Sequence, residues 1–130
     1  MASEIDETAA KSYFTNYRIM PKGDICSIAS GDIPDFDLLC AGFPCQSFSN
    51  VGQRGGLEDP RGALIFQVIR ILRECKPKAF ILENVKGLLS HNCGKTFRII
   101  VGGLIECGYE VYSKILLASQ SWDLSIKSLQ

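Results

Sequence analysis

The chain has 130 residues, of which 46% are hydrophobic and 22% are charged, so it is long enough for one ordinary domain and is not a disordered sequence. Its 14 basic and 14 acidic side chains cancel, which excludes the basic footprint of proteins that bind nucleic acid through bulk charge. No apolar run approaches the roughly 20 residues that span a bilayer, and the acidic N-terminus is unlike a signal peptide, so we expect a cytoplasmic protein without membrane contact.

The first elements in chain order are weakly marked. Residues 4–17 have a helical composition and are followed by a cluster of helix breakers at residues 21–24. Residues 25–28 fit a weak strand or a turn, and residues 30–34 fit a loop. The first strong strand is predicted at residues 36–40, which are mostly apolar and are bounded by aspartates and a glycine.

The central part of the chain predicts a strand, a helix and a second strand. After a polar, glycine-rich loop at residues 47–62, apolar side chains recur at helical spacing over residues 61–76. A proline ends that helix, and residues 78–82 predict a buried strand. This order demands a parallel sheet with a right-handed crossover. Residues 95–106 predict another helix and residues 110–117 a further strand.

Two reactive groups follow the two strands of this unit. Cys45 comes directly after Pro44 in a tight turn beyond the first strand, and Glu83 and Asn84 come directly after the second. The proline stiffens the turn and presents the thiol at a strand end, which suits a nucleophile better than a core cysteine. Ligands of an open parallel sheet bind at the carboxyl ends of its strands, so we expect the thiol and the carboxylate to meet at one edge.

A cytosine ring is the kind of substrate that suits this pair. A carboxylate beside a thiol disfavours the thiolate, so Glu83 would act better in its protonated form on the substrate. Protonation or hydrogen bonding at N3 of cytosine opens C6 to addition of the thiol and makes C5 nucleophilic. A thiol hydrolase or a redox protein would instead need a base or a resolving cysteine near Cys45, and we expect Cys40 to point into the sheet packing.

The six cysteines have no metal-binding pattern. They form no Cys-x-x-Cys pair and no paired spacing with histidine, so we expect reduced thiols and no metal site. Apart from Cys45, we expect most of them to be buried as small hydrophobic side chains.

At these residues the chain resembles the C5-cytosine methyltransferases. Residues 42–49 resemble the Pro-Cys-Gln nucleophile motif of that family, and residues 83–85 resemble its Glu-Asn-Val motif. Residues 3–6 resemble the acidic segment that holds the ribose of S-adenosylmethionine, and residues 23–25 resemble the segment that contacts its adenine. Residues 59–64 resemble the start of the helix that follows the catalytic loop.

The resemblance covers about residues 3–117 and implies an α/β fold. The implied fold is a partial Rossmann-like, S-adenosylmethionine-dependent methyltransferase fold with a mostly parallel sheet and flanking helices. Residues 1–117 would form a partial catalytic domain without the first strand and its glycine-rich loop, the target-recognition region and the closing motifs. Residues 118–130 would be a divergent tail, because the expected Gln-x-Arg-x-Arg motif is not matched there. The unmatched strands would leave sheet edges open and favour association.

The resemblance implies a role for each matching residue of the catalytic loop and strand ends. Cys45 would attack C6 of a cytosine that has left the DNA helix, and Glu83 would engage N3. Asn84 would support the local structure, while Pro44 would shape the loop and border the cofactor. The residues implied to approach DNA are Gln46, Ser49 and Arg61.

The implied cofactor is S-adenosylmethionine. Glu4 would accept hydrogen bonds from the ribose hydroxyls, and Asp24 would accept one from the adenine amino group. The apolar residues implied to pack around the adenine, besides Pro44 at the border of the site, are Ile5, Ile25 and Leu64.

The implied function is DNA (cytosine-5)-methylation in a restriction-modification system, with DNA as the partner and a complementary methyltransferase chain as a further candidate partner. Two alternatives stay open. The unmatched glycine-rich loop and arginine motif favour an inactive or regulatory remnant, and tRNA is a second candidate substrate within the family. On this basis we expect the chain alone to be inactive or weakly active.

Overall fold

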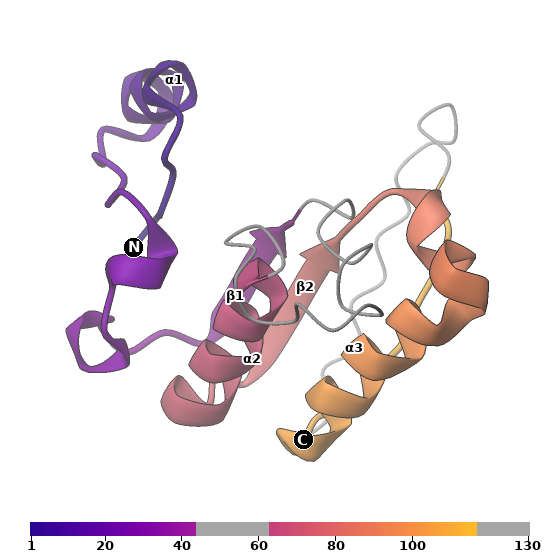
Figure 1. The fold of residues 1–130 in the computed structure, drawn as a ribbon. Coiled ribbons are helices and arrows are strands. Elements are labelled where there is room, and N and C mark those ends of the chain that lie inside the picture. Colours follow the sequence, from indigo (N-terminus) through magenta and orange to yellow (C-terminus); the bar gives the residue numbers. More distant parts are fainter. Residues whose placement is uncertain (44–62, 117–130) are drawn as a thin grey trace.

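The computed structural model describes residues 1–43 and 63–116 (Figure 1). Within these ranges no helix is long and apolar enough to cross a membrane. With η marking a short 3₁₀ helix, the elements in chain order are α1 (Glu7–Tyr17), η1 (Ile25–Ser27), η2 (Ser30–Asp32), β1 (Leu38–Gly42), α2 (Ala63–Cys75), β2 (Ala79–Glu83), η4 (Lys86–Leu89), η5 (His91–Gly94) and α3 (Lys95–Glu106).

β1 and β2 form a two-stranded parallel sheet, which confirms the predicted α/β fold and the strand–helix–strand unit. The first residue of β1 pairs with Ala79, and the last, Gly42, pairs with Glu83, so the two carboxyl ends are level. β1 begins at Leu38 instead of residue 36, because the polar Asp37 lies at the entrance of the ladder, where it forms an ion pair with Lys78 at 2.9 Å.

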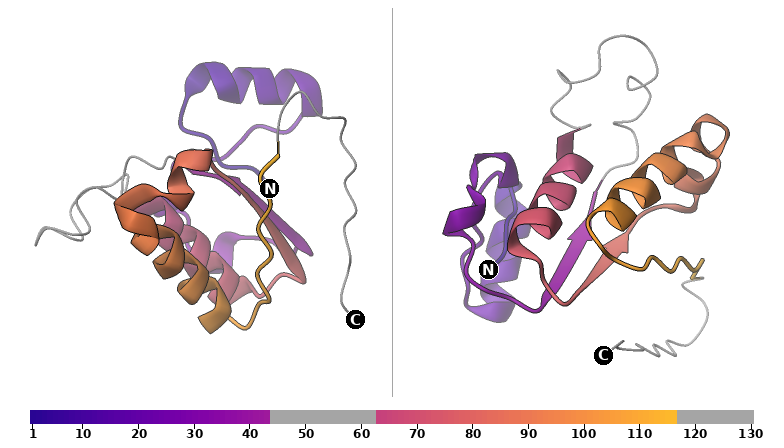
Figure 2. Two further views of the ribbon diagram at one scale, coloured as in Figure 1. Left: turned by 90° about the vertical axis from the view of Figure 1, so that its right-hand side faces the viewer. Right: turned by 90° about the horizontal axis from the view of Figure 1, so that it is seen from below.

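α2 and α3 pack on one face of this sheet, as the views of Figures 1 and 2 show. In α2, Ile65, Val68 and Leu72 recur at helical spacing and are buried. Alternate strand residues, such as Leu39 and Phe80, pack against the same cluster from the sheet side. The buried residues of this core are Phe43, Ile65, Val68, Leu72, Leu88, Ile100 and Leu104.

The opposite face of the sheet is open in the part of the chain that the structure describes. Leu38 and Ile81 remain 46% and 43% exposed, and Cys40 between them in the pleat is also exposed. The expectation that Cys40 points into the sheet packing is therefore wrong. Successive strand residues face opposite sides, and both described helices that pack on the sheet take the other side. Parallel sheets are usually covered on both faces.

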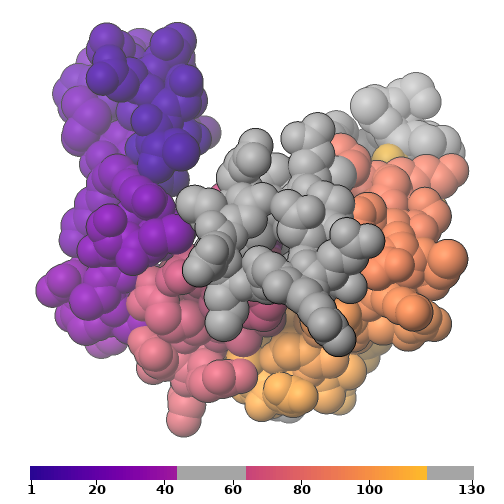
Figure 3. All heavy atoms as spheres, viewed as in Figure 1, coloured from indigo at the N-terminus to yellow at the C-terminus, as the bar shows by residue number. Residues whose placement is uncertain are grey.

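The N-terminal part projects as a lobe of its own, which Figure 3 shows at the indigo end of the chain. α1 begins at Glu7 rather than at residue 4, because the Asp6 carboxylate accepts a hydrogen bond from the Ala9 amide at 2.7 Å and caps the helix. None of its residues is buried. The residues before it are extended, and Ser3 forms a parallel bridge with Lys22.

α3 matches the predicted helix at residues 95–106, whereas the strand predicted at residues 110–117 is not formed over the described residues 110–116. This segment runs beyond β2, on the side away from β1 (Figure 2). It is fixed by Tyr109, whose hydroxyl donates to the Pro77 carbonyl at 2.6 Å. The sheet of the described residues contains β1 and β2 only, so the segment forms no ladder with the neighbouring β2.

Candidate active site

The carboxyl ends of β1 and β2 form the first part of the candidate site. Gly42 pairs with Glu83 at the end of the ladder, and Glu83 is exposed. A Cβ atom placed on Gly42 would lie 3.5 Å from Glu83 Oε2, so the carboxylate lies close to the Gly42 backbone. Cys45 follows Gly42 by three positions in the sequence. The strands therefore bring Glu83 to the end of the segment that leads into Cys45, and the meeting of thiol and carboxylate stays a prediction.

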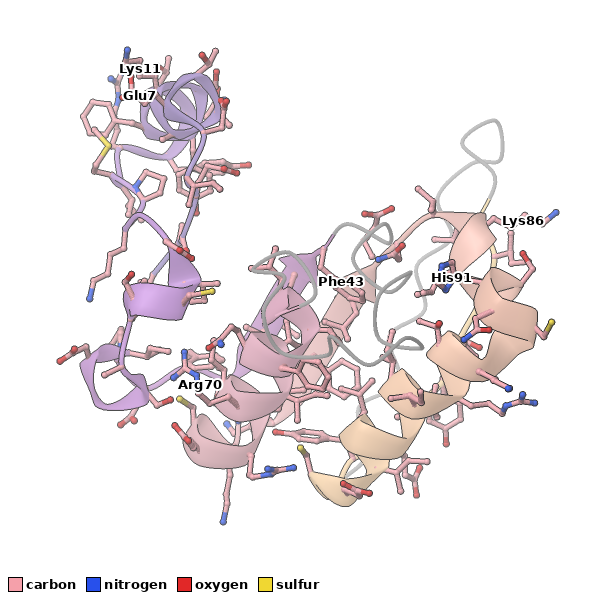
Figure 4. All side chains as sticks on the ribbon, in the orientation of Figure 1. Glu7, Lys11, Phe43, Arg70, Lys86 and His91 are labelled. Atoms are coloured by element: carbon pink, nitrogen blue, oxygen red, sulfur yellow. The ribbon has the colours of Figure 1, made fainter. Side chains whose placement is uncertain are left out.

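Asn84 connects these two strand ends directly. Its side-chain Nδ2 donates to the carbonyl oxygen of Phe43 at 2.5 Å, and its Oδ1 accepts from the Val85 amide at 2.9 Å. Phe43 is 8% exposed and belongs to the core, so its ring is held between sheet and helices (Figure 4). The backbone just before Pro44 is thus fixed relative to Glu83 by a core side chain and an amide.

A second pair of parallel segments carries the residues assigned to the cofactor. The bridge between Ser3 and Lys22 is closed by hydrogen bonds from the Glu4 amide to the Lys22 carbonyl at 2.9 Å and from the Lys22 amide to the Ala2 carbonyl at 2.8 Å. Glu4 comes directly after the bridged residue Ser3, and Asp24 comes two positions after the bridged residue Lys22. Both carboxylates therefore lie where these parallel segments end, as Glu83 does in the main sheet.

Each of these two carboxylates also has a local structural role. Glu4 is half-buried, and its Oε1 accepts from the Asp6 amide at 2.8 Å. Asp24 is exposed, and its Oδ1 accepts from the Cys26 amide at 2.9 Å, which caps η1. Burial, together with the hydrogen bond and charge of Asp24, raises the pKa of the Cys26 thiol, so Cys26 is a poor nucleophile.

The apolar residues assigned to the adenine do not share one buried surface. Leu64 packs against the core between sheet and helices, whereas Ile5 is 75% exposed. Ile25 is half-buried in η1. A packed adenine pocket made of all three is therefore not present in the described structure. The assigned residues that lie outside the described ranges are Pro44, Cys45, Gln46, Ser49 and Arg61.

Sequence reasoning missed Arg70 of α2, which binds the segment after Asp24. Its guanidinium donates to the Ile28 carbonyl at 2.9 Å and to Ser30 Oγ at 2.5 Å. The helical pattern places Arg70 on the polar side of α2, and this pattern does not distinguish it from an arginine that is simply solvated. Among the described residues, no cluster of His, Cys, Asp and Glu could hold a metal ion.

The sequence of the chain is similar to known proteins over most of its length. The sequence profile of the C-5 cytosine-specific DNA methylase family matches residues 1–121. The chain is 49% identical over 117 residues to the type II methyltransferase M1.ScrFI of Lactococcus lactis subsp. cremoris. The matched region covers 90% of this chain and 30% of that protein. It is 50% identical over 115 residues to M.BsuFI of Bacillus subtilis, covering 88% and 28%, and 50% identical over 117 residues to M.SsoII of Shigella sonnei, covering 90% and 31%.

A parallel α/β sheet with polar groups at its carboxyl edge is typical of proteins that bind ligands at the strand ends. The matched profile and the relatives place that architecture more closely: the chain belongs to the C-5 cytosine-specific DNA methylase family. The family inferred from the sequence motifs is thereby confirmed. The chain spans about 30% of the length of the curated relatives it matches.

Proposed function

We propose that the chain carries the nucleophile and the acid of a DNA (cytosine-5)-methyltransferase, which transfers a methyl group from S-adenosylmethionine to C5 of cytosine in DNA. The observation that supports this most is the level pairing of Gly42 with Glu83. It puts a carboxyl group at the end of the strand that leads into Pro44 and Cys45. The family is named for C-5 cytosine methylation, and in the proposed reaction the two groups would act on one base.

The reaction that we propose begins with a cytosine turned out of the DNA helix, because C6 cannot be reached inside the base stack. Cys45, as the thiolate, forms a bond to C6 while Glu83 gives a proton to N3, and the electron pair of the C5–C6 double bond becomes available at C5. S-adenosylmethionine, when bound, supplies an electrophilic methyl group. Once C5 has bonded the methyl group, loss of the C5 proton to a base and return of the N3 proton to Glu83 restore the double bond and expel Cys45 from C6 as the thiolate.

Asn84 has a supporting part in this proposal. Its hydrogen bond to the Phe43 carbonyl fixes the backbone immediately before Pro44 against the end of β2. Cys45 and Glu83 must reach C6 and N3, which lie opposite each other on one small ring, so an error of about 1 Å in the separation of the two side chains would lower the rate. Asn84 thus acts as a positioning residue for the nucleophile loop.

Glu4 and Asp24 fit the adenosine part of the cofactor. Two carboxylates at the ends of parallel segments can accept hydrogen bonds from two hydroxyls and one amino group. Asp24 uses Oδ1 for the η1 cap, so Oδ2 is the oxygen that would accept from the adenine amino group. Glu4 would hold the ribose in the same way. Ile25 would lie against the ring, whereas Leu64 already packs in the core.

Covalent trapping on DNA that contains 5-fluorocytosine tests the proposal, because fluorine at C5 cannot leave as a proton does and the thiol adduct persists. We expect an adduct on duplex DNA in the presence of S-adenosylmethionine and a complementary methyltransferase chain. Cys45→Ser should abolish it, and the matched variant Cys40→Ser, an exposed thiol of β1, should retain it.

The outcomes of this experiment separate the competing functions. An adduct that forms on tRNA and not on duplex DNA would replace the DNA assignment by RNA methylation. No adduct on either substrate, with an intact fold in circular dichroism, would contradict the enzyme and favour the inactive remnant. An adduct that survives Cys45→Ser would show that another thiol reacts.

A further inference from the structure

Among the described residues, Arg70 makes the most hydrogen bonds between the N-terminal segments and the rest of the structure. Figure 4 shows it on the side of α2 that faces η1 and η2. Its Nη1 donates to Ser30 Oγ at 2.5 Å, and its Nη2 donates to the carbonyl oxygens of Ile28 at 2.9 Å and Ile25 at 3.4 Å. These acceptors lie 40 to 45 positions away in the sequence. One guanidinium therefore binds both short 3₁₀ turns.

The guanidinium is also held in place from its own helix. Its Nε donates to Gln67 Oε1 at 2.7 Å, and Glu74 lies 3.9 Å from Nη1. The side chain is 25% exposed, so these bonds are partly shielded from water. A planar guanidinium presents its donors in a fixed fork, and with both edges used its orientation is determined.

The segment that Arg70 binds has little support of its own. η1 and η2 are single turns without a buried residue, and such short helices are not stable alone. The other described side-chain contacts to this segment are weaker or lie nearer its C-terminal end. Cys75 Sγ lies 3.9 Å from the Ser30 carbonyl oxygen, and Lys22 Nζ donates to the Asp32 carbonyl at 3.2 Å. The position of the segment therefore depends on Arg70 more than on any other described side chain.

Asp24 belongs to the same structural unit, because it caps η1 and directly precedes Ile25, whose carbonyl Arg70 binds. We propose that Arg70 is a positioning residue for adenine recognition: it holds η1 and η2 against α2 and so sets the place of Asp24 and Ile25. This inference rests on the proposed function, which gives Asp24 the adenine amino group as its ligand. Arg70 itself contacts neither the cofactor nor the base in this role.

Two substitutions separate the geometry of Arg70 from its charge. Arg70→Gln removes the charge and most donors, while Arg70→Lys keeps the charge and loses the fork that reaches several acceptors at once. Arg73→Gln is the matched control, since Arg73 is an exposed arginine of the same helix. All three variants keep the buried face of α2 unchanged.

Hydrogen exchange of the full chain tests the anchor without any ligand. The amides of Ser27 and Ile28 donate to the carbonyls of Asp24 and Ile25 and should exchange about tenfold faster in Arg70→Gln. Arg70→Lys should give an intermediate rate, and Arg73→Gln should match the wild type. Core amides such as that of Ile100 should be unaffected, which excludes general unfolding. Equal rates at Ser27 in wild type and Arg70→Gln would overturn the anchor.

Ligand preference tests the positioning role. Ligand-observed NMR on the full chain, which detects even weak binding, compares S-adenosylhomocysteine with its inosine analogue, which lacks the amino group. The wild type should prefer the adenine compound about tenfold, the value of one hydrogen bond to a carboxylate. Arg70→Gln and Asp24→Ala should both lose this preference. A substitution that only destabilised the fold would lower the affinity for both ligands equally.

The results distinguish failure of this inference from failure of the proposed function. If the wild type prefers adenine and Arg70→Gln keeps that preference, the positioning role is overturned and the adenine site stands. If the wild type binds neither compound or shows no preference, the adenine site of the proposed function fails, and the role of Arg70 in recognition fails with it. The exchange experiment would then still show whether Arg70 anchors η1 and η2.

Discussion

Asn84 joins the two strand ends of the candidate site with one hydrogen bond. Its partner, the Phe43 carbonyl, lies 41 positions earlier in the chain and immediately before Pro44. The amide donates across the strand ends while its oxygen accepts from the next backbone amide, so the side chain cannot rotate without losing both bonds. At the residue scale, the end of β1 is therefore tied to the end of β2 by an uncharged side chain next to Glu83.

Replacing Asn84 by alanine should remove this connection. We expect Asn84→Ala to lower the free energy of unfolding by about 1 kcal/mol, the usual net value of one internal hydrogen bond. We also expect it to slow covalent trapping at Cys45 by more than this loss of stability explains. Urea unfolding and trapping kinetics measure the two effects. Asn16→Ala is the matched control, because the Asn16 amide donates to the Ser12 carbonyl on an exposed helix. Equal effects of the two variants would contradict the positioning role.

Two adjacent glycines of α3 show how an element can depart from its propensity for a packing reason. Glycine inside a helix costs roughly 1 kcal/mol relative to alanine. A Cβ atom on Gly103 would lie 2.8 Å from Ile69 Cδ1 of α2, whereas one on Gly102 would meet nothing within 4 Å. At the element scale, Gly103 allows α3 to approach α2 closely, and Gly102 has no such contact.

Alanine at these two positions should therefore have different effects. Gly102→Ala should stabilise the chain by about 0.5–1 kcal/mol, because it gains helix propensity without a clash. Gly103→Ala gains the same propensity but forces Ile69 aside, so its net effect should be smaller or of opposite sign. Thermal unfolding followed by circular dichroism measures the difference. A Gly103→Ala variant as stable as Gly102→Ala would show that Ile69 moves at no cost.

At the scale of the whole molecule, the sheet has one covered and one open face in the described structure. α2 and α3 cover the face that carries Leu39 and Phe80, while Leu38 and Ile81 stay largely exposed on the other. Exposed apolar surface on a parallel sheet favours contact with another surface, since such sheets are normally buried on both sides. Self-association through this face follows as an expectation for the isolated chain.

Substitution on the open face should reduce that association. We expect the chain to form dimers or larger species at micromolar concentration, and Ile81→Thr, which keeps a β-branched side chain, to shift it toward monomer. Ile105→Thr on α3 is the control, because Ile105 is 56% exposed but lies on a helix. Size-exclusion chromatography with light scattering measures the mass. A monomeric wild type, or equal shifts for both variants, would contradict the role of this face.

The predicted elements succeeded where the sequence pattern is strong and local. The helix at residues 95–106 was predicted with its observed bounds, and the parallel pairing followed from the order of strand, helix and strand. The start of α1 was predicted three residues too early, because residues 4–6 have a helical composition but the helix is capped at Asp6. The strand predicted at residues 110–117 is not formed over its described part, because a strand is defined by ladder hydrogen bonds and the apolar pattern of a segment does not determine whether they form.

The sequence by itself determined the family of this protein, and it predicts the reactive groups. Pro44, Cys45 and Glu83 follow predicted strands in short motifs, and motifs of this kind carry their chemistry within a few neighbouring residues. That β1 and β2 end at one edge of the sheet also followed from the order of the elements, since parallel strands end on one side.

Only the tertiary structure decided the register and the cross-links. The pairing of Gly42 with Glu83, the bond from Asn84 to Phe43 and the bonds of Arg70 to η1 and η2 join residues about 40 positions apart. Such contacts depend on how a helix lies on a sheet and where two strands end. Local periodicity does not encode these distances, because many packings satisfy the same apolar pattern.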